Sequence, residues 1–386
     1  MNFSAGFAFT CPFKTNSGNR ALEHLPVELS GLNAFKPLIV TSKELTGPKA
    51  IRTLTGAFGD SGMTLGVFDG VTDKADLSLV AELKDNFGKG QYDSIIALGG
   101  GVVVDVAKIL NLAVTLKTAD LHQLSEETAV RSPLGPFVVI PTAATTGMET
   151  SKYAFLNRKT FVSTYLMPDL VILDSRLIRA NDGKTIAETG LAAFGQALEA
   201  SVAPDRNPFM DAYATAALSF IRENLIQSVK RPGNKKAALF VANAVAMSGC
   251  VISNTTRDVL QRLGHIFHEM VHVHPGVVIG MAMPIVLADC LKEDAHLGTV
   301  LFRCLTGDDE YVATPEEKRG DKAMSILGAF QNDLYGLVGG KMPRNLKEAG
   351  IPQYMMDDIF DVVAREPDGS YLRTVIDRVG GNSAKS

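Results

Sequence analysis

The chain has 386 residues, a length that predicts two domains of ordinary size. Hydrophobic residues make up 46% of the sequence and charged residues 21%, which excludes a disordered or fibrous chain. The formal net charge is −4, and lysine and arginine are scattered along the chain, so no nucleic-acid or anionic-membrane surface is expected. We therefore expect small-molecule partners.

The four cysteines lie far apart, and none forms a CxxC pair: Cys11, Cys250, Cys290 and Cys304. This spacing is typical of reduced thiols in a cytoplasm. Residues 1–15 lack the basic start and compact apolar stretch of a signal peptide, and no run of eighteen apolar residues exists. We expect a cytoplasmic protein that does not enter a membrane.

Short apolar runs in the first half predict buried strands at 36–41, 93–98, 136–140 and 170–173. Helical periodicity fills two of the intervals between them, at 74–88 and 103–115. Alternating strands and helices are typical of βαβ units. Residues 1–178 are therefore expected to form an α/β domain with a doubly wound parallel sheet.

The pattern changes after Asp174, where alanine, leucine and methionine recur at helical spacing with almost no β-branched alternation. The expected helices are 184–202, 207–229, 236–254, 256–273, 276–290 and 321–338, followed by short helices in 343–386. Residues 179–386 are therefore expected to form an all-α domain.

Three consecutive glycines, Gly99, Gly100 and Gly101, connect the strand at 93–98 directly to the helix at 103–115. Residues without a Cβ let backbone N–H groups approach a phosphate, and the helix amino terminus adds partial positive charge. The alternative is a tight strand-to-helix turn, because a glycine cluster alone is a weak signal and the spacing is not GxGxxG.

The segment 99–108, GGGVVVDVAK, resembles the GGGSxxDxAK signature of the group III, "iron-containing" alcohol dehydrogenases, whose relatives include glycerol dehydrogenase and dehydroquinate synthase. Residues 141–149 are similar to that family's PTTxGTGSE loop, and 167–174 match its P-x-x-x-x-x-D strand. Further similarity at 188–191 and 342–346 extends the resemblance over nearly the whole chain. It implies a dinucleotide-binding α/β domain followed by an all-α domain, and we expect a homo-oligomer, a dimer.

In that family the dinucleotide lies between the two domains. The resemblance implies that the glycine loop and the start of its helix contact or support the pyrophosphate, through Gly99, Gly100, Gly101, Val102, Asp105 and Lys108. Hydroxyl groups of the second loop would face the same cofactor, at Thr142, Thr145 and Thr146. For Thr142 the alternative is local capping of the backbone.

The choice between NAD and NADP depends on the end of the strand at 36–41. Family members carry an acidic residue there that holds the ribose hydroxyls, whereas this chain has Ser42 followed by Lys43. Without that negative charge a 2′-phosphate is not repelled, and Lys43 would attract it. The expected cofactor is therefore NAD or NADP, although a lysine at this place is more often a solvated surface residue.

The family binds one divalent metal, which stabilises the alkoxide from which hydride leaves. Its ligands are an Asp and a His four apart, a His on a second helix and a His at the start of the next. The equivalent positions here are Ala192, Gln196, Gln261 and Pro275. We therefore predict that no metal binds at the family's usual position.

Four of the seven histidines nevertheless lie close to that place, namely His265, His268, His272 and His274. One hypothesis is a metal-free site in which His265 or His268 donates and accepts the proton. Another is a relocated zinc or iron on the 265–274 segment, held by His265, His268 and His272 at i, i+3 and i+7, with Glu199 or Glu269 completing the coordination. The third is that some of these histidines simply pack or point to solvent.

These features predict an NAD(P)-dependent oxidoreductase that moves a hydride between a nicotinamide and a small alcohol or aldehyde. Two other classes stay open. One is a non-redox synthase or lyase with bound NAD, disfavoured because His265 and His268 are three apart rather than four as in dehydroquinate synthases. The other is a catalytically inactive nucleotide-binding homologue, suggested by the lost ligands.

Overall fold

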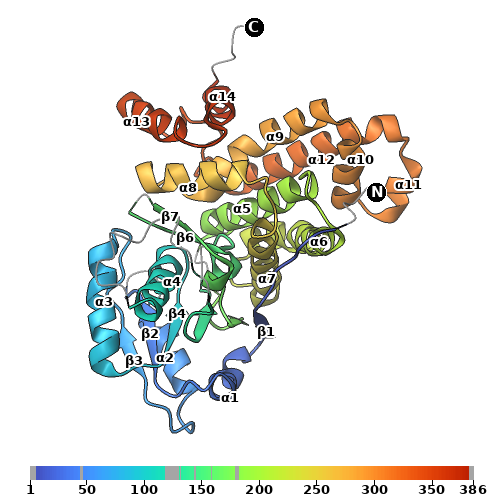
Figure 1. Ribbon diagram of the computed structural model, residues 1–386. Coiled ribbons are helices and arrows are strands. Elements are labelled where there is room, and N and C mark those ends of the chain that lie inside the picture. Colours follow the sequence, from blue (N-terminus) through green and yellow to red (C-terminus); the bar gives the residue numbers. More distant parts are fainter. Residues whose placement is uncertain are drawn as a thin grey trace. The chain divides into compact units, whose positions relative to one another are not determined.

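The computed structural model describes residues 6–43, 47–117, 130, 132–142, 145–157, 159–178 and 182–381. The chain folds into two compact units (Figure 1). The sheet unit comprises Thr10–Ala180 and Gly233–Ser253, and the helical unit comprises Met1–Phe9, Asn181–Pro232 and Asn254–Ser386. The predicted α/β first half and all-helical second half are confirmed.

The sheet unit is built on six parallel strands in the order β1-β8-β5-β4-β2-β3. The strands are β1 (Lys14–Gly18), β2 (Pro37–Thr41), β3 (Gly66–Phe68), β4 (Ser94–Leu98), β5 (Phe137–Ile140) and β8 (Leu170–Asp174). Sequence analysis missed β1 and β3. Polar KTNSG and three-residue GVF carry no apolar run, so their pairing depends on the neighbouring strands.

Alternate residues of the central strands face opposite sides of the sheet. Ile95 and Ala97 of β4 pack in a core with helices α3 (Leu77–Gly90) and α4 (Val102–Thr115). Ile96 and Leu98 pack in a second core with α1 (Leu25–Gly31) and α2 (Pro48–Gly56). Both faces are covered, which is why these strands are continuously apolar.

Helix α7 (Lys235–Ile252) belongs to the sheet unit, although its sequence reads like the helices around it. Its Ala242 and Ala246 cover Val171 and Leu173 of β8, which neither core just described includes. The physical reason is burial of the outer part of the sheet. A single division of the chain after residue 178 stays a prediction, and it does not describe where α7 packs.

The sheet unit also contains an antiparallel pair, β6 (Tyr153–Leu156) and β7 (Lys159–Val162), which packs on the α4 side. The described part of this unit also has short 3₁₀ turns, at η1 (Ala21–His24), η3 (Met148–Thr150) and η4 (Thr164–Leu166).

The helical unit surrounds α5 (Gly183–Ser201), whose residues from Ile186 onward are all buried. The other helices are α6 (Pro208–Lys230), α8 (Val259–Val271), α9 (Pro275–Glu293), α10 (Leu297–Leu305), α11 (Asp308–Ala313), α12 (Glu316–Leu337), α13 (Gln353–Val363) and α14 (Gly369–Val379). Gly276 lets α9 approach α5 closely, because a Cβ there would lie 1.8 Å from the carbonyl oxygen of Glu188. This contact places the start of α9 beside α5.

Among the residues that the structure describes, two helices, α7 and α9, are long and apolar enough to cross a membrane by length and composition. About 61% and 67% of their apolar windows are buried inside the structure, as expected for core helices. Their hydrophobicity is accounted for by packing within each unit.

Candidate functional site

The glycine loop joins β4 to α4 in the way the sequence predicts. Gly99 and Gly101 have φ values of +154° and +42°, which residues with a Cβ rarely adopt. A Cβ on Gly99 would also lie 3.0 Å from Val103, whereas one on Gly101 would meet nothing within 4 Å. No side chain caps α4. The N–H groups of Val103, Val104 and Asp105 donate to the carbonyl oxygens of Gly100 and Gly101, so the N–H groups that remain for an anion are those of Gly100, Gly101 and Val102.

The loop lies where the strand order changes direction. From β2 the chain moves outward to β3 and then returns to β4 on the other side of β2. Ligands of doubly wound sheets bind at this switch point, beyond the carboxyl ends of the strands. The tertiary structure therefore brings the glycine loop and the end of β2 to one place.

Hydrogen bonds fix these strand ends together. The Thr41 hydroxyl donates to the carbonyl oxygen of Leu98 over 2.7 Å, and Gly99 N–H donates to that of Ile140 over 3.1 Å. Ser42 and Thr142 are both buried; Ser42 follows β2 directly, and Thr142 lies two residues after the end of β5. Three sequence-predicted positions, Ser42, Gly99 and Thr142, thus stand at adjoining strand ends.

A carboxylate that sequence analysis missed also stands at this edge. Asp69, directly after β3, lies 3.2 Å from Nζ of Lys43 through its Oδ1, and its carbonyl oxygen accepts the Lys43 N–H. The register of β2 and β3 produces this contact, and the only sequence signal was an acidic residue after a very short strand. Lys43 is therefore paired with a carboxylate.

Asp105 and Lys108 attach α4 to the segment that follows β5. The buried Lys108 ammonium donates to the carbonyl oxygens of Met148, Ser151 and Tyr153 at 2.6–2.7 Å. Asp105 Oδ1 accepts from the N–H of Phe155 at 3.2 Å. Burial lowers the pKa of Lys108 to about 8, although Asp105 and Glu149 oppose this shift. These two side chains therefore contact protein groups, and Val102 begins the helix.

The second predicted loop is only partly described, because Ala143 and Ala144 lie outside the described residues. Thr145 and Thr146 are both buried. Burial raises the pKa of Glu149 to about 7, while hydrogen bonds, including one with Thr145, and the Lys108 charge oppose it. The described part of this loop, Thr145, Thr146 and Glu149, is therefore buried in the sheet unit.

In the helical unit, two of the four positions equivalent to the family's metal ligands form an amide pair. Gln196 Nε2 donates to Gln261 Oε1, and Gln261 Nε2 donates to Nε2 of His265. All three side chains are buried. Ala192 and Pro275 carry no side-chain donor atom, and neutral amides are poor ligands for transition metals. The residues present therefore do not fit the family's metal.

The relocated three-histidine site is not formed. The described part of the chain contains no group of three or more His, Cys, Asp or Glu side chains that could hold a metal ion. His265 turns toward Gln261, whereas His272 ends α8 at a positive φ of 55° and is exposed. The prediction of i, i+3 and i+7 ligands on one helical face was wrong because the helix ends before His272.

The two acids considered as further ligands have different surroundings. Glu199 on α5 accepts from the N–H of Leu260 at 3.1 Å, at the start of α8. Burial raises its pKa to about 8, and this backbone bond opposes the shift. The negative charge of Glu269 raises the pKa of His268 against a larger lowering by burial. The Glu199 carboxyl therefore caps the amino terminus of α8.

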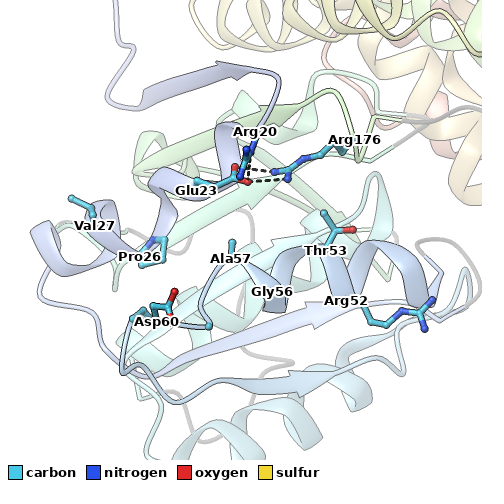
Figure 2. A pocket seen from close by; sticks show the side chains of 12 residues that line it. Arg20, Glu23, Pro26, Val27, Arg52, Thr53, Gly56, Ala57, Asp60 and Arg176 are labelled. Carbon is cyan, nitrogen blue, oxygen red and sulfur yellow. Dashed lines mark hydrogen bonds and ion pairs between the residues drawn. The ribbon is translucent and has the colours of Figure 1, made fainter.

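A surface pocket of about 610 Å³ lies elsewhere in the sheet unit, between η1 and α2 (Figure 2). None of the predicted site residues lines it. Its Arg20 and Arg176 both reach Glu23, at 3.1 and 2.9 Å, and Arg176 also pairs with Asp174 at 2.7 Å. These arginines are neutralised by protein carboxylates, which join η1 to the end of β8.

Comparisons with known proteins cover almost the whole chain. The family model of iron-containing alcohol dehydrogenase matches residues 12–175, and that of the C-terminal domain of Fe-containing alcohol dehydrogenases matches 186–368. The 1,3-propanediol dehydrogenase of Citrobacter freundii is 29% identical over 377 residues, covering 95% of this chain and 91% of its own. The NAD-dependent methanol dehydrogenase of Bacillus methanolicus is 26% identical over 355 residues, covering 89% and 91%. The crystal structure of a 1,3-propanediol oxidoreductase has a TM-score of 0.85 at 22% identity, covering 97% and 100%.

Proposed function

Because this chain belongs to the iron-containing alcohol dehydrogenase family, we propose that it is an NAD(P)-dependent oxidoreductase of small alcohols and aldehydes that works without the family's metal. Full-length relatives named as alcohol, propanediol and methanol dehydrogenases support the reaction class. The metal-free part rests on one observation, the Gln196–Gln261–His265 hydrogen-bond chain.

That chain uses two of the donor atoms that a metal would need. The lone pair of His265 Nε2 already accepts the Gln261 amide, and the Gln261 oxygen already accepts the Gln196 amide. Displacing these bonds for a cation would leave buried amides unpaired, which costs about 1–3 kcal/mol for each group. The arrangement favours a neutral hydrogen-bonded interior over a metal centre.

The glycine loop and its neighbours fit a dinucleotide. When bound, the nicotinamide supplies the hydride acceptor or donor of the reaction. We propose pyrophosphate contacts at Gly99, Gly100 and Gly101, with Thr142 at the adjoining strand end, because these groups lie at the switch point of the sheet. Thr145 and Thr146 complete the loop, while Asp105 and Lys108 position it.

Ser42 and Asp69 bear on the choice between NAD and NADP. The Asp69 carboxylate forms an ion pair with Lys43. The positive charge of Lys43 is therefore less available to a 2′-phosphate than the sequence suggests. The Asp69 carboxylate also places a negative charge at the edge of the sheet where Ser42 stands in place of the family's acidic residue. We therefore propose that NAD is the better cofactor.

The histidines of α8 are proposed to move the proton. An alcohol is a weak acid, and without a Lewis acid its hydroxyl proton needs a base. Gln261 holds His265 with its Nε2 as the acceptor, which places the proton of the neutral ring on Nδ1, so in this arrangement His265 donates a proton and His268 is the group that accepts one. His268 lies one turn further along the same helix.

The decisive experiment measures oxidation of NADH and NADPH by a panel of short aldehydes and ketones, before and after dialysis against a chelator. We expect turnover to survive dialysis, and His265→Ala or His268→Ala to lower it by about 10²–10⁴-fold. His296→Asn, at an exposed histidine of α10's N-terminus, is the control. If no substrate is reduced while dinucleotide still binds, the protein is one of the non-redox or inactive homologues.

A further inference from the structure

Two histidines at the junction of α8 and α9 have unusual surroundings within the helical unit. His268 lies in the last turn of α8, and His274 immediately precedes α9, with His272 and Val273 between the helices. His268 Nδ1 and His274 Nε2 are both hidden from solvent, and neither has a hydrogen-bond partner in the described part of the chain. Buried polar atoms are normally paired, so both atoms need an explanation.

His274 presents a hydrogen-bond donor. Its Nδ1 accepts from the N–H of Gly276 at 3.1 Å and so caps α9. Burial, followed by the nearby His268 and Lys184 charges, lowers the pKa of His274 to about 3, so its ring is neutral at pH 7. A neutral ring that accepts at Nδ1 carries its proton on Nε2. The hidden Nε2–H therefore has no acceptor.

His268 presents the complementary acceptor. A hydrogen bond to the backbone of Val273 raises the pKa of its ring, as donation to a carbonyl oxygen does, although burial lowers that pKa more strongly. Because Nδ1 has no partner, this donation comes from Nε2. The neutral ring then keeps a free lone pair on Nδ1. The junction thus holds one unpaired donor and one unpaired acceptor.

We propose that His274 and His268 together bind the reacting oxygen of the alcohol or aldehyde substrate. A hydroxyl oxygen accepts from His274 Nε2–H while its own proton is donated to His268 Nδ1, so one hydroxyl satisfies both atoms. This inference rests on the proposed function and adds His274, whose neutral ring donates a hydrogen bond from Nε2–H to the oxygen in place of the metal. A metal-bound alkoxide is not needed when a donor and a base share the oxygen.

The proton and electron balance follows from this arrangement. In oxidation, the hydroxyl proton passes to His268 Nδ1, the carbon–hydrogen bond breaks with its electron pair moving to the nicotinamide, and a carbonyl forms. In reduction, protonated His268 and neutral His274 both donate to the carbonyl oxygen, the hydride arrives at carbon, and His268 releases its proton to the new alkoxide oxygen. Oxidation therefore needs neutral His268, and reduction needs the protonated ring.

The pH dependence follows from the groups around His268. Burial and the charge of His272 lower its pKa, whereas Glu269 and the Val273 carbonyl raise it, with the first effect largest. On α5, Lys184, whose charge acts on His274, is paired with Glu188 at 3.6 Å. Aldehyde reduction should therefore decline as pH rises through the lowered pKa of His268, and alcohol oxidation should increase over the same range.

The test is His274→Asn, assayed with butanal and NADH and with 1-butanol and NAD. Asparagine is a good N-cap and can still accept from Gly276 N–H, but it has no donor at the position of Nε2. We expect kcat in both directions to fall on the order of 10²-fold, as for the loss of one oxyanion donor, with NADH affinity unchanged. His268→Gln should also lower kcat, and its remaining activity should no longer change with pH over the range in which His268 titrates.

The matched control is His296→Asn, which should change neither activity nor NADH binding. Activity of His274→Asn within about threefold of the wild type, with chelated wild-type enzyme active, would overturn the two-histidine site and leave the proposed function standing. An inactive wild-type enzyme would instead reject the proposed function.

A second measurement does not need a stable variant. In ¹⁵N-histidine-labelled wild-type protein with NADH, butyramide offers a carbonyl oxygen that is not reduced. We expect the His274 Nε2 and His268 Nδ1 resonances to move on its addition, while those of His24 and His296 stay unchanged. Movement of His265 alone, or none at saturating butyramide, contradicts the assignment.

Discussion

Gln261 donates a hydrogen bond from its side-chain amide to Nε2 of His265, one helical turn away on α8. The same glutamine accepts from Gln196 on α5, so it connects two helices through neutral groups. In relatives that bind a metal, the resemblance places imidazoles at the two glutamine positions. In this chain, hydrogen bonds between neutral groups therefore stand where the resemblance places metal ligands.

Restoring the four ligand types should restore metal binding. We expect wild-type protein to retain no stoichiometric zinc or iron after chelator dialysis, because Ala192 and Pro275 have no donor atoms and the two amides bind each other. The combined variant Ala192→Asp, Gln196→His, Gln261→His and Pro275→His should take up about one equivalent. Elemental analysis measures both, with Gln196→His alone as control. One tightly held equivalent in the wild type would reject the metal-free proposal.

Gly100→Leu should abolish dinucleotide binding. The left-handed glycines of the loop are Gly99 and Gly101, so a leucine at position 100 tests occupation of the space beside the helix start with less backbone strain. Titration of NADH fluorescence gives the affinity, and the melting temperature shows whether the fold is intact. Unchanged affinity in a folded variant would mean that the glycines form only a turn.

Cofactor preference should respond to the charges around Lys43. Ser42→Asp adds a carboxylate where a 2′-phosphate would lie and should penalise NADP by about fivefold or more, the scale of one charge pair near 4 Å in water. Asp69→Asn releases Lys43 from its 3.2 Å ion pair and should shift preference toward NADP. The ratio of kcat/KM for NADH and NADPH is the measurement. If both variants keep the wild-type ratio, this edge of the sheet does not contact the ribose.

Glu199 should make stability depend on pH. Burial raises its pKa in the folded protein to about 8, above the usual 4.5, so its contribution to stability is full below pH 4.5 and is lost progressively as pH rises to about 8. Glu199→Gln keeps an acceptor for Leu260 N–H but cannot ionise. The melting temperature of the variant, relative to that of the wild type, should rise as the pH is raised from 5 to 8. A difference independent of pH would show that Glu199 does not titrate there.

The sequence alone determined the parts of this protein that depend on local chemistry. Buried parallel strands are apolar on both faces, so the runs that became β2, β4, β5 and β8 were recognisable without their neighbours. The three glycines predicted a strand-to-helix loop because Gly99 and Gly101 must adopt backbone angles that other residues avoid. The lost ligand atoms at Ala192 and Pro275 were equally visible, since ligand chemistry belongs to the side chain itself.

Contacts between distant segments were decided only by the tertiary structure. Gln196 and Gln261 are 65 residues apart, and Lys108 reaches carbonyl groups 40 to 45 residues further along the chain. Asp69 contacts Lys43 because β3 pairs with β2. Helix α7 packs in the sheet unit because its alanines bury Val171 and Leu173. A polar side chain can bond to many groups, and an amphipathic helix can cover many surfaces. The partner that each one takes is set by which elements the folded chain brings within a few ångströms, which no local pattern records.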